Sequence, residues 1–450
     1  MIEEREIPKS WIIASTNDIC LKITDGSHFS PKSCEDGYPY VTVKDIKNDR
    51  IDFNNCLKIS EEDFIKLKKN DCQPLENDLL FSKDGTVGKV AIVNFNKDFV
   101  VLSSIAILRT DTNLISPKFL FHILKSNKFL RKALDQKKGV AIRRLILRDL
   151  KELELVLPPL AEQHRIVARI EELFSSLDKG IEALKTAQQQ LKVYRQAVLK
   201  YAFEGRLTHP NLQEGELPDG WVNANLGLIK EFSMYGPRFS SDEYSNDGVA
   251  ILRTSDISEN GKVDWANAPK LILSENEYEK YKLIQGDLLI TRTGSIGTVS
   301  VFNDNKRAIA GAFLIYYRLK PPINMWYIYY FLKSFKAQKH FKKFSSGVGR
   351  PNLNVPNIEL LHIPIPDIQS QNQIVQEIES RLSVCDKIEE NITQSLQQAE
   401  ALRQSILKKA FEGKLVPQDP SDEPTSVLLE RIKAKKEKIK PENAVRKKKV

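Results

Sequence analysis

The chain carries the stretch LPPLAEQHRIVARIEELFSSLDKG at residues 157–180 and a related stretch, IPDIQSQNQIVQEIESRLSVCDKI, at residues 365–388. The similarity continues without a gap to positions 207 and 415, and about 20 of the 51 aligned positions are identical. Both copies end on the same tetrapeptide, AFEG. An offset of 208 residues is far longer than a solenoid repeat. The repeat therefore indicates that one large unit has been duplicated.

Each copy predicts one long amphipathic helix. Prolines break the chain just before each expected helix, and Gly205 and Gly413 suit helix C-termini, so helices are expected over about 160–203 and 368–411. A helix of this length extends about 65 Å and cannot pack on one small module alone. We expect the two helices to pair antiparallel within one chain; the alternative is pairing in trans in a dimer. The heptad seam is expected to contain Leu184, Ala187, Leu191, Tyr194, Val198 and Tyr201 of the first helix. The second helix carries one broad apolar face that should meet this seam, with Ile374, Ile378, Leu382, Cys385, Ile388, Ile392, Leu396, Ala399, Leu402 and Ile406.

The segments that flank the helices also repeat. Pro8-x-x-Trp11 corresponds to Pro218-x-x-Trp221, and DLLFSKDGTVGKVAIV at 78–93 matches DLLITRTGSIGTVSVF at 287–302 as strand, glycine turn and strand. The predicted fold class is therefore α+β, with two globular domains joined by two long antiparallel coiled-coil helices as a pseudo-twofold internal repeat. The expected domains are module 1 (1–156), a central helical repeat (157–207), module 2 (208–364), a distal helical repeat (365–415) and a basic C-terminal tail (416–450).

Composition places the chain among ordinary globular proteins. It has 450 residues, of which 41% are hydrophobic and 28% charged. No apolar run is long enough for a membrane-spanning helix, and residues 1–10 lack the pattern of a signal peptide. The five cysteines form no CxxC pair, which argues against a zinc site or a disulfide framework. We therefore expect a cytoplasmic protein.

The common catalytic motifs are missing. Gly85-TV-Gly88-Lys89 is two residues too short for a phosphate-binding loop, and its counterpart at 294–298 has lost the lysine. The sequence contains neither an HExxH zinc motif nor an [DN]PP[YFW] motif of an amino-methyltransferase. We therefore predict that the chain is not an enzyme and has no catalytic residue, no metal site and no cofactor of its own.

The net charge of +9 is concentrated in the tail. Residues 427–450 contain ten Lys and Arg against three Glu, a balance of +7, which leaves +2 for the rest of the chain. A charge run of this kind is typical of a solvated, partly disordered extension. The overall charge is therefore weak evidence for nucleic-acid binding.

Two shorter basic segments are more informative because they occupy equivalent positions in the repeat. Residues 125–148 contain nine Lys and Arg with one acid, Asp135, and residues 333–350 contain six with none. A spacing of three residues places several of them on one helix face, where they could meet DNA phosphates. The alternative is an ordinary solvated helix face.

Two pairs of loops could contact base edges. The first pair is 82–86 and 291–295, and the second is 138–144 and 347–352; both combine glycines with basic or polar side chains that can bind guanine or adenine. The alternatives are a plain hairpin turn and a simple connecting loop. The predicted DNA-binding residues are Lys83, Thr86, Lys125, Lys128, Arg131, Lys138, Arg143, Arg144, Arg292, Ser295, Lys333, Lys336, Lys339, Arg350 and Asn352.

Two variable modules that alternate with helical repeats bearing PPLAEQ and AFEG[RK]L resemble the specificity subunit of type I restriction–modification systems. The resemblance extends from Pro8 to Lys433, although the second copy has IPDIQSQ where the first has LPPLAEQ. It implies that each module is a target-recognition domain for one half of a split site in double-stranded DNA. It also implies that the helices set the distance between the halves and dock two modification subunits, which carry S-adenosylmethionine and methylate adenine. Restriction subunits, with ATP and Mg²⁺, could join them.

Side chains outside the helical seam are candidates for binding those subunits. The predicted subunit-binding residues are Gln163, Phe174, Phe203, Gln371 and Phe411. The alternative for Phe203 and Phe411 is that they cap the ends of the coiled coil. A different function also stays open at this point, namely a coiled-coil scaffold whose modules bind proteins.

Overall fold

The computed structural model describes residues 7–136, 145–345 and 351–447, with side chains described up to residue 439. The chain forms two compact units. Unit 1 comprises Met1–Ala183 and Ser395–Val450, and unit 2 comprises Leu184–Gln394. Each unit therefore contains one globular module and one half of each long helix. In the described part of the chain, no helix is both long and apolar enough to cross a membrane.

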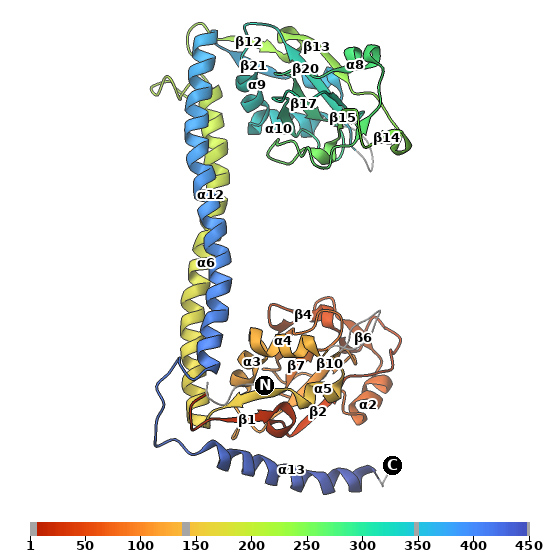
Figure 1. The fold of residues 1–450 in the computed structure, drawn as a ribbon, viewed down its shortest axis with the longest axis vertical. Coiled ribbons are helices and arrows are strands. Elements are labelled where there is room, and N and C mark those ends of the chain that lie inside the picture. Colours follow the sequence, from red (N-terminus) through yellow and green to blue (C-terminus); the bar gives the residue numbers. More distant parts are fainter. Residues whose placement is uncertain (1–6, 137–144, 346–350, 448–450) are drawn as a thin grey trace. The chain divides into compact units, whose positions relative to one another are not determined.

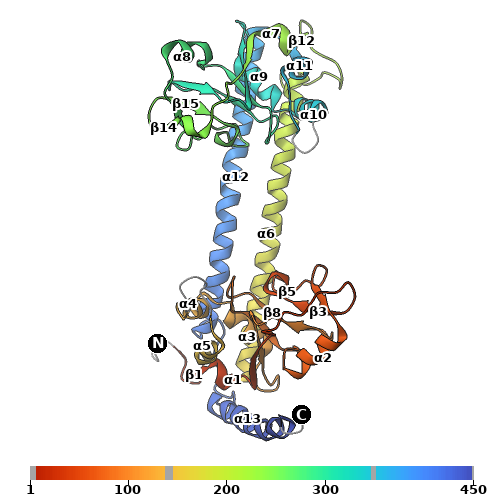
Figure 2. The same cartoon turned by 90° about the vertical axis from the view of Figure 1, so that its right-hand side faces the viewer.

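The two long helices begin and end where the repeat predicts. They are α6 (Leu160–Phe203) and α12 (Ile368–Phe411), each of 44 residues. They lie side by side in both units (Figures 1 and 2). In unit 1 Arg403 of α12 forms an ion pair with Asp178 of α6, and in unit 2 Arg195 Nη2 lies 2.6 Å from Asp386 Oδ1. These are equivalent pairs in the repeat, and they confirm the antiparallel pairing within one chain.

The predicted seam is wrong at four positions. Tyr194 and Tyr201 of α6 are 45% and 42% exposed, and Ile388 and Leu402 of α12 are 41% and 51% exposed. A straight α-helix has 3.6 residues per turn, so a pattern of 3.5 drifts around the helix until its members leave the interface. These four side chains consequently face solvent.

Module 1 is built on a four-stranded antiparallel sheet of order β2-β10-β7-β8, beside a three-stranded sheet of order β6-β3-β9. Buried apolar residues such as Leu79 and Phe81 pack beneath α3 and α4. The strands are β1 (Ile12–Ser15), β2 (Lys22–Asp25), β3 (Tyr38–Val41), β4 (Ile46–Lys47), β5 (Arg50–Ile51), β6 (Leu57–Ile59), β7 (Leu79–Ser82), β8 (Val90–Ile92), β9 (Val100–Val101), β10 (Ile105–Arg109) and β11 (Glu154–Leu157). The helices are α1 (Thr16–Ile19), α2 (Glu61–Lys69), α3 (Pro117–Leu124), α4 (Asn127–Asp135) and α5 (Leu147–Glu152), with the 3-10 helix η2 (Val43–Asp45).

Module 2 repeats the central sheet with the order β13-β20-β17-β18, and a second sheet has the order β14-β16-β15-β19. The α+β class is thus confirmed in both modules. The strands are β12 (Val222–Asn225), β13 (Lys230–Tyr235), β14 (Tyr244–Ser245), β15 (Val249–Leu252), β16 (Lys270–Leu271), β17 (Leu288–Thr291), β18 (Val299–Val301), β19 (Ala308–Ala310), β20 (Leu314–Leu319) and β21 (His362–Ile365). The helices are α7 (Leu226–Ile229), α8 (Glu275–Tyr281), α9 (Met325–Leu332), α10 (Phe335–Phe344) and α11 (Val355–Glu359), with the 3-10 helices η3 (Ser241–Glu243) and η4 (Thr254–Asp256).

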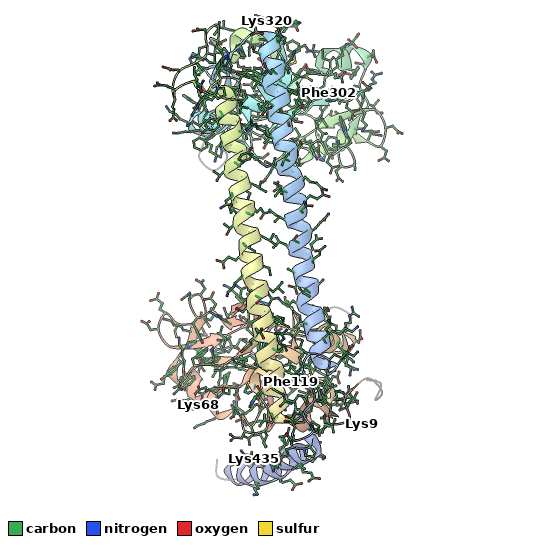
Figure 3. The ribbon with its side chains drawn as sticks, turned by 90° about the vertical axis from the view of Figure 1, so that its left-hand side faces the viewer. Lys9, Lys68, Phe119, Phe302, Lys320 and Lys435 are labelled. Atoms are coloured by element: carbon green, nitrogen blue, oxygen red, sulfur yellow. The ribbon has the colours of Figure 1, made fainter. Side chains whose placement is uncertain are left out.

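Each module shares its core with the ends of the long helices. In unit 1 the buried cluster includes Ile166 of α6 and Ile406 of α12, and in unit 2 it includes Val198 and Ile374. Figure 3 shows Phe119 of α3 at this junction, and its ring centroid is 5.6 Å from that of Phe411. The ends of the long helices are therefore part of the module cores. Within each unit, this packing gives the module a defined orientation on the helix halves that it contacts.

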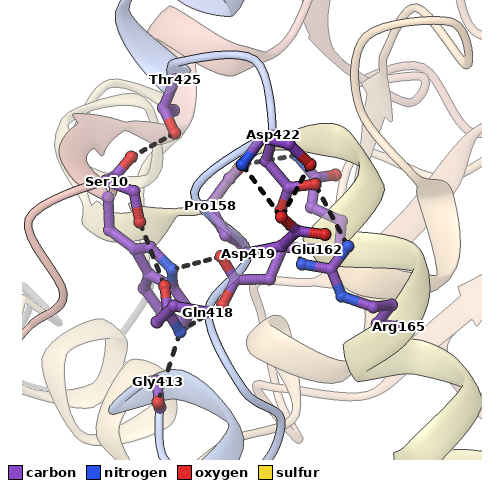
Figure 4. Close-up of polar contacts among 12 residues, drawn as sticks. Ser10, Pro158, Glu162, Arg165, Gly413, Gln418, Asp419, Asp422 and Thr425 are labelled. Carbon is purple, nitrogen blue, oxygen red and sulfur yellow. Dashed lines mark hydrogen bonds and ion pairs between the residues drawn. The ribbon is translucent and has the colours of Figure 1, made fainter.

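The C-terminal tail is structured, contrary to the expectation of a solvated and partly disordered extension. Residues Thr425–Lys447 form α13, and its Leu428 and Ile432 are buried in the core of module 1. Thr425 Oγ1 donates a hydrogen bond of 2.6 Å to the carbonyl of Ser10 (Figure 4). The run of charge in residues 427–450 hides these apolar positions, four residues apart, which form one face of a helix.

Candidate nucleic-acid interface

The β7–β8 loop and its counterpart between β17 and β18 have the same shape. In module 1 the Ser82 hydroxyl donates to the Thr86 carbonyl (2.6 Å) and accepts from the Lys89 amide (2.8 Å). In module 2 the Thr291 hydroxyl makes the same two bonds, to Ser295 and from Thr298. At the tips, Gly85 and Gly294 have φ angles of 63° and 72°, which favour glycine. Thr86 and Ser295, beside them, are exposed.

The same loops contact the basic helices and the residues that follow the predicted glycine loops. A Cβ on Gly88 would lie 2.5 Å from Leu130 of α4, and one on Gly297 would lie 2.9 Å from Phe341 of α10, so glycine permits the close approach. The amide of Leu145 donates to the Lys83 carbonyl (3.1 Å), and that of Leu353 to the Arg292 carbonyl (2.9 Å). In each module the structure therefore brings the hairpin loop against the basic helix and against the residue that follows the predicted glycine loop, Leu145 or Leu353.

The basic helices present part of their charge to solvent. Lys128 and Arg131 of α4 are exposed, as are Lys336 and Lys339 of α10. Lys132, by contrast, is half-buried near Glu154, and burial lowers the pKa of its ammonium group. In unit 1 these side chains line a groove of about 700 Å³ between α4, β11 and α12. Its wall is formed by Ile123, Ser126, Asn127, Lys128, Phe129, Arg131, Lys132, Asp135, Glu154, Leu155, Val156, Ala401, Gln404, Ser405, Lys408, Phe411 and Glu412.

Two of the predicted phosphate-binding lysines have structural partners. Lys125 forms an ion pair with Asp49, and Lys333 Nζ donates to the Asn260 carbonyl (3.0 Å) and lies 5.0 Å from the centroid of the Tyr329 ring. Asp49 and Asn260 occupy corresponding turns of the two modules. Both lysines are half-buried, so they hold a turn in place rather than presenting a bare ammonium group as predicted.

The basic residue of the hairpin loop differs between the modules. Lys83 is only 6% exposed, and its Nζ lies 3.3 Å from Asp25 Oδ2. The prediction that Lys83 is available to DNA is therefore wrong, because the Asp25 carboxylate at the end of β2 draws its ammonium group inward. Arg292 stays partly exposed, with its guanidinium 4.4 Å from the Tyr235 ring centroid and its Nε donating to Asn352 Oδ1 (2.9 Å). Four further predicted residues, Lys138, Arg143, Arg144 and Arg350, lie outside the described residues.

The family model for the type I restriction modification DNA specificity domain matches residues 8–192 and 218–398. The chain belongs to this family. Specificity subunits of this kind recognise DNA sites in two parts, assemble with methyltransferase subunits and catalyse no reaction themselves, and this chain has that function. The family needs no cofactor bound to the specificity subunit itself.

Several relatives match almost the full length of this specificity subunit. The specificity subunit of the Escherichia coli enzyme EcoBI is 27% identical over 478 residues, covering 98% of this chain and 96% of the relative. That of EcoKI from Escherichia coli K12 is 26% identical and covers 98% and 99%. Among solved structures, the HsdS subunit from Thermoanaerobacter tengcongensis has a TM-score of 0.55 at 18% identity, covering 91% of this chain and 98% of that one. A chain from a study of complex assembly in a type I system has a TM-score of 0.71 at 19% identity, covering 91% and 99%.

The glutamines predicted to bind partner subunits lie inside the specificity subunit. Gln163 and Gln371 are 0% and 2% exposed. Gln163 Oε1 accepts from the Ser116 amide (2.9 Å) and its Nε2 donates to the Pro158 carbonyl (3.0 Å). Gln371 makes the same bonds with Asn324 and Pro366. Both glutamines therefore tie the start of a long helix to a module helix, and a partner could not reach their side chains.

The predicted phenylalanines are also part of the module–helix junctions. Phe203 and Phe411 are 6% and 5% exposed, and the Phe203 ring packs edge-on against Phe331, with centroids 5.0 Å apart. This agrees with the alternative that they cap the helix ends. Phe174 is half-buried between His122 and the Arg403 guanidinium, which lies 4.6 Å above its ring. None of the three presents an open apolar face to a partner.

Sequence reasoning missed the apolar side chains that the helices of the specificity subunit do expose. Tyr194 and Leu402 are equivalent positions of the repeat, and Val193 and Val384 of unit 2 are 70% and 58% exposed. Tyr194 and Leu402 gave no signal of exposure, because they fit the spacing of the predicted seam, whereas Val193 and Val384 lie outside that spacing. It also missed Asp25 and Tyr235, which decide the surroundings of Lys83 and Arg292 and which no shared motif marks.

Proposed function

We propose that each module recognises one half of the split DNA site through its hairpin loop, its basic helix and the adjoining glycine loop. One observation supports this assignment most strongly. The same backbone hydrogen bonds shape the hairpin loop and join it to the residue after the glycine loop in both modules, whereas the exposed side chains of the hairpin loops differ. A shared frame with different exposed side chains is what two related readers of different base sequences require.

The direct contacts divide by chemistry. Lys128, Arg131, Lys336 and Lys339 on the exposed helix faces are suited to phosphates. The candidates for base edges are Thr86, Arg292, Ser295 and Asn352, with Lys138, Arg143, Arg144 and Arg350 of the glycine loops remaining predictions. Four phosphate contacts correspond to a log–log salt slope of about −3.6. Because the proposed partners are DNA and the modification subunits, we infer a cytoplasmic location.

Two modification subunits would bind the exposed faces of the helix pair. Tyr194 in unit 2 and Leu402 in unit 1 are equivalent and both about half exposed, at 45% and 51%. A repeated apolar position on two related surfaces supports one partner copy on each. S-adenosylmethionine would be carried by the modification subunits, and ATP with Mg²⁺ by restriction subunits where these join the complex.

Co-expression with the cognate methyltransferase subunit, followed by genome-wide mapping of methylated adenine, tests the recognition function. The expected result is one split motif with a constant gap. Replacing residues 208–364 by the second module of another specificity subunit should change one half of that motif and leave the other intact. Methylation without a split motif, or a change in both halves, would contradict the proposal.

The docking surfaces can be tested separately by measuring the mass of the complex. Tyr194→Arg or Leu402→Arg should each remove one of two methyltransferase subunits, and the double variant should remove both. Gln189→Arg is the matched control, since Gln189 is exposed on α6 but lies about 140° around the helix from Tyr194. Full assembly by the double variant would rule out these surfaces.

A further inference from the structure

We propose that Arg292 reads a guanine in the half-site bound by module 2, and that its counterpart in module 1, Lys83, takes no part in base recognition. The inference rests on the proposed function and adds the identity of one base and of the residue that selects it. Equivalent positions in the two modules would then have different roles.

Backbone pairing establishes that the two residues are equivalent. The Lys83 amide donates to the Ser104 carbonyl (2.9 Å), and the Arg292 amide donates to the Phe313 carbonyl (3.0 Å). In module 1, Asp25 of β2 pairs with Ala106 of β10, and in module 2, Tyr235 of β13 pairs with Ile315 of β20. These are matching places in the two sheets. The loop residue therefore faces an aspartate in module 1 and a tyrosine in module 2.

In module 2 the guanidinium is held from two sides. It stacks on the Tyr235 ring at 4.4 Å, and the Tyr235 hydroxyl is itself fixed by the amide of Val355 (3.0 Å). Arg292 Nε donates to Asn352 Oδ1 (2.9 Å). No described carboxylate pairs with Arg292, and residues 346–350, which adjoin Asn352 in the sequence, contain no acid. The full positive charge and the two Nη groups therefore remain for an outside acceptor.

This arrangement suits a base edge better than a phosphate. Guanine offers O6 and N7 as two acceptors in the major groove, and a forked guanidinium of fixed orientation can bind both. A phosphate needs the charge but not the orientation. Phe313, whose backbone carries the Arg292 hydrogen bond, is 53% exposed. An apolar ring beside the arginine is suited to contact with a base, for example a thymine methyl group, and would gain nothing from a phosphate.

Module 1 has the opposite chemistry at the same place. The Lys83 ammonium group is buried against Asp25, and the side chain is only 8% exposed. Its charge is neutralised within the protein, and lysine lacks the planar fork of arginine. Module 1 must therefore recognise its half-site through other groups, such as Thr86.

The test uses the complex with methyltransferase subunits and maps methylated adenines for wild type, Arg292→Lys and Arg292→Gln. One half of the wild-type motif should contain a G·C pair that both variants relax, with discrimination at that pair falling about 5- to 150-fold and the other half unchanged. Tyr235→Asp should relax the same pair, because it installs the neutralising carboxylate of module 1. This variant also covers the case in which Arg292→Gln does not assemble.

The matched control is Arg307→Lys. Arg307 also stacks on a tyrosine, Tyr278, at 4.1 Å, but its Nη2 is paired with Glu275 at 2.6 Å, so its replacement should leave the motif unchanged. Wild-type discrimination in Arg292→Lys would indicate a phosphate contact and overturn the inference. So would relaxation at an A·T pair. Absence of a split motif in the wild type would instead refute the proposed function, which keeps the two failures distinct.

Discussion

Each module packs in the same way on the C-terminal end of one long helix, module 2 on α6 and module 1 on α12. Only module 2 follows its helix directly in the sequence. Gly205, at the end of α6, is followed closely by Pro218 and Trp221; a Cβ at this glycine would lie 2.3 Å from Pro218. Gly413, at the end of α12, packs in the same way on Pro8, which lies at the other end of the chain, with a corresponding distance of 2.2 Å. The packing is therefore independent of the peptide connection.

Module 1 replaces the missing connection with side-chain contacts. Gln418 Nε2 donates to Glu162 Oε1 (2.6 Å), and Arg165 Nη2 donates to Asp422 Oδ2 (2.6 Å), as Figure 4 shows. Trp11 Nε1 also donates to Glu162 Oε2 (2.9 Å). Beyond these contacts α13 adds the buried Ile432. We therefore expect changes in the C-terminal segment to destabilise module 1 and to leave the stability of module 2 unchanged.

The largest effect is expected from Ile432→Asp. This side chain is fully buried, and an unpaired carboxylate at such a site costs about 3–5 kcal/mol, enough to release α13. Hydrogen exchange should increase in β1 and α1 of module 1 and stay unchanged in the corresponding β12 and α7 of module 2. Lys433→Asp, at the exposed neighbouring position, is the control. Equal exchange in both modules would contradict the comparison.

A pH dependence should also be confined to module 1. Burial lowers the pKa of His122 to about 4 from its ordinary 6.5, whereas burial raises the pKa of the equivalent Tyr330 of module 2 further above its ordinary 10. The unfolded chain binds the proton at a higher pH than the folded module does, so His122 does not lower the free energy of unfolding above pH 6.5. As the pH falls from 6.5 to 4, the free energy of unfolding decreases by about 3 kcal/mol. Hydrogen exchange, corrected for intrinsic rates, should show this loss in wild type and not in His122→Tyr.

The buried glutamines should behave alike in the two modules. Gln163→Leu leaves the Ser116 amide and the Pro158 carbonyl without their partner, and Gln371→Leu does the same to Asn324 and Pro366. Each substitution should cost about 2 kcal/mol in its own module. Urea unfolding with the exposed Gln189→Leu as control measures the loss. A large loss in one module alone would show that the junctions are not equivalent.

The smallest effect is expected from the ion pairs between the helices. Arg195→Ala and Arg403→Ala each remove a partly exposed pair worth about 0.2–1 kcal/mol. Arg403→Ala should be slightly worse, because Arg403 also covers the Phe174 ring. The melting temperature of each variant should lie a few degrees at most below that of the wild type. An effect of several kcal/mol would mean that these pairs determine the helix register.

Much of the architecture could be predicted from the repeat. The bounds of α6 and α12 follow from prolines and glycines that flank a long apolar periodicity, and these are local signals. The seam at Tyr194 and Leu402 could not be predicted in the same way, because small deviations of the helical period accumulate over many turns. The docking of α13 was hidden for another reason. Its buried apolar residues, Leu428 and Ile432, are few among many lysines, and only the surface of module 1 makes their burial favourable.

The sequence by itself determined the duplication, the two helices, the family and the positions of the loops that repeat between modules. These features rest on periodicity and identity over long stretches, so single errors do not alter them. Only the tertiary structure decided which equivalent residues are available. Lys83 is buried and Arg292 is not, because Asp25 and Tyr235 lie opposite them on a strand that is distant in the sequence. The charge that a side chain presents to solvent depends on such neighbours, and no local pattern encodes them.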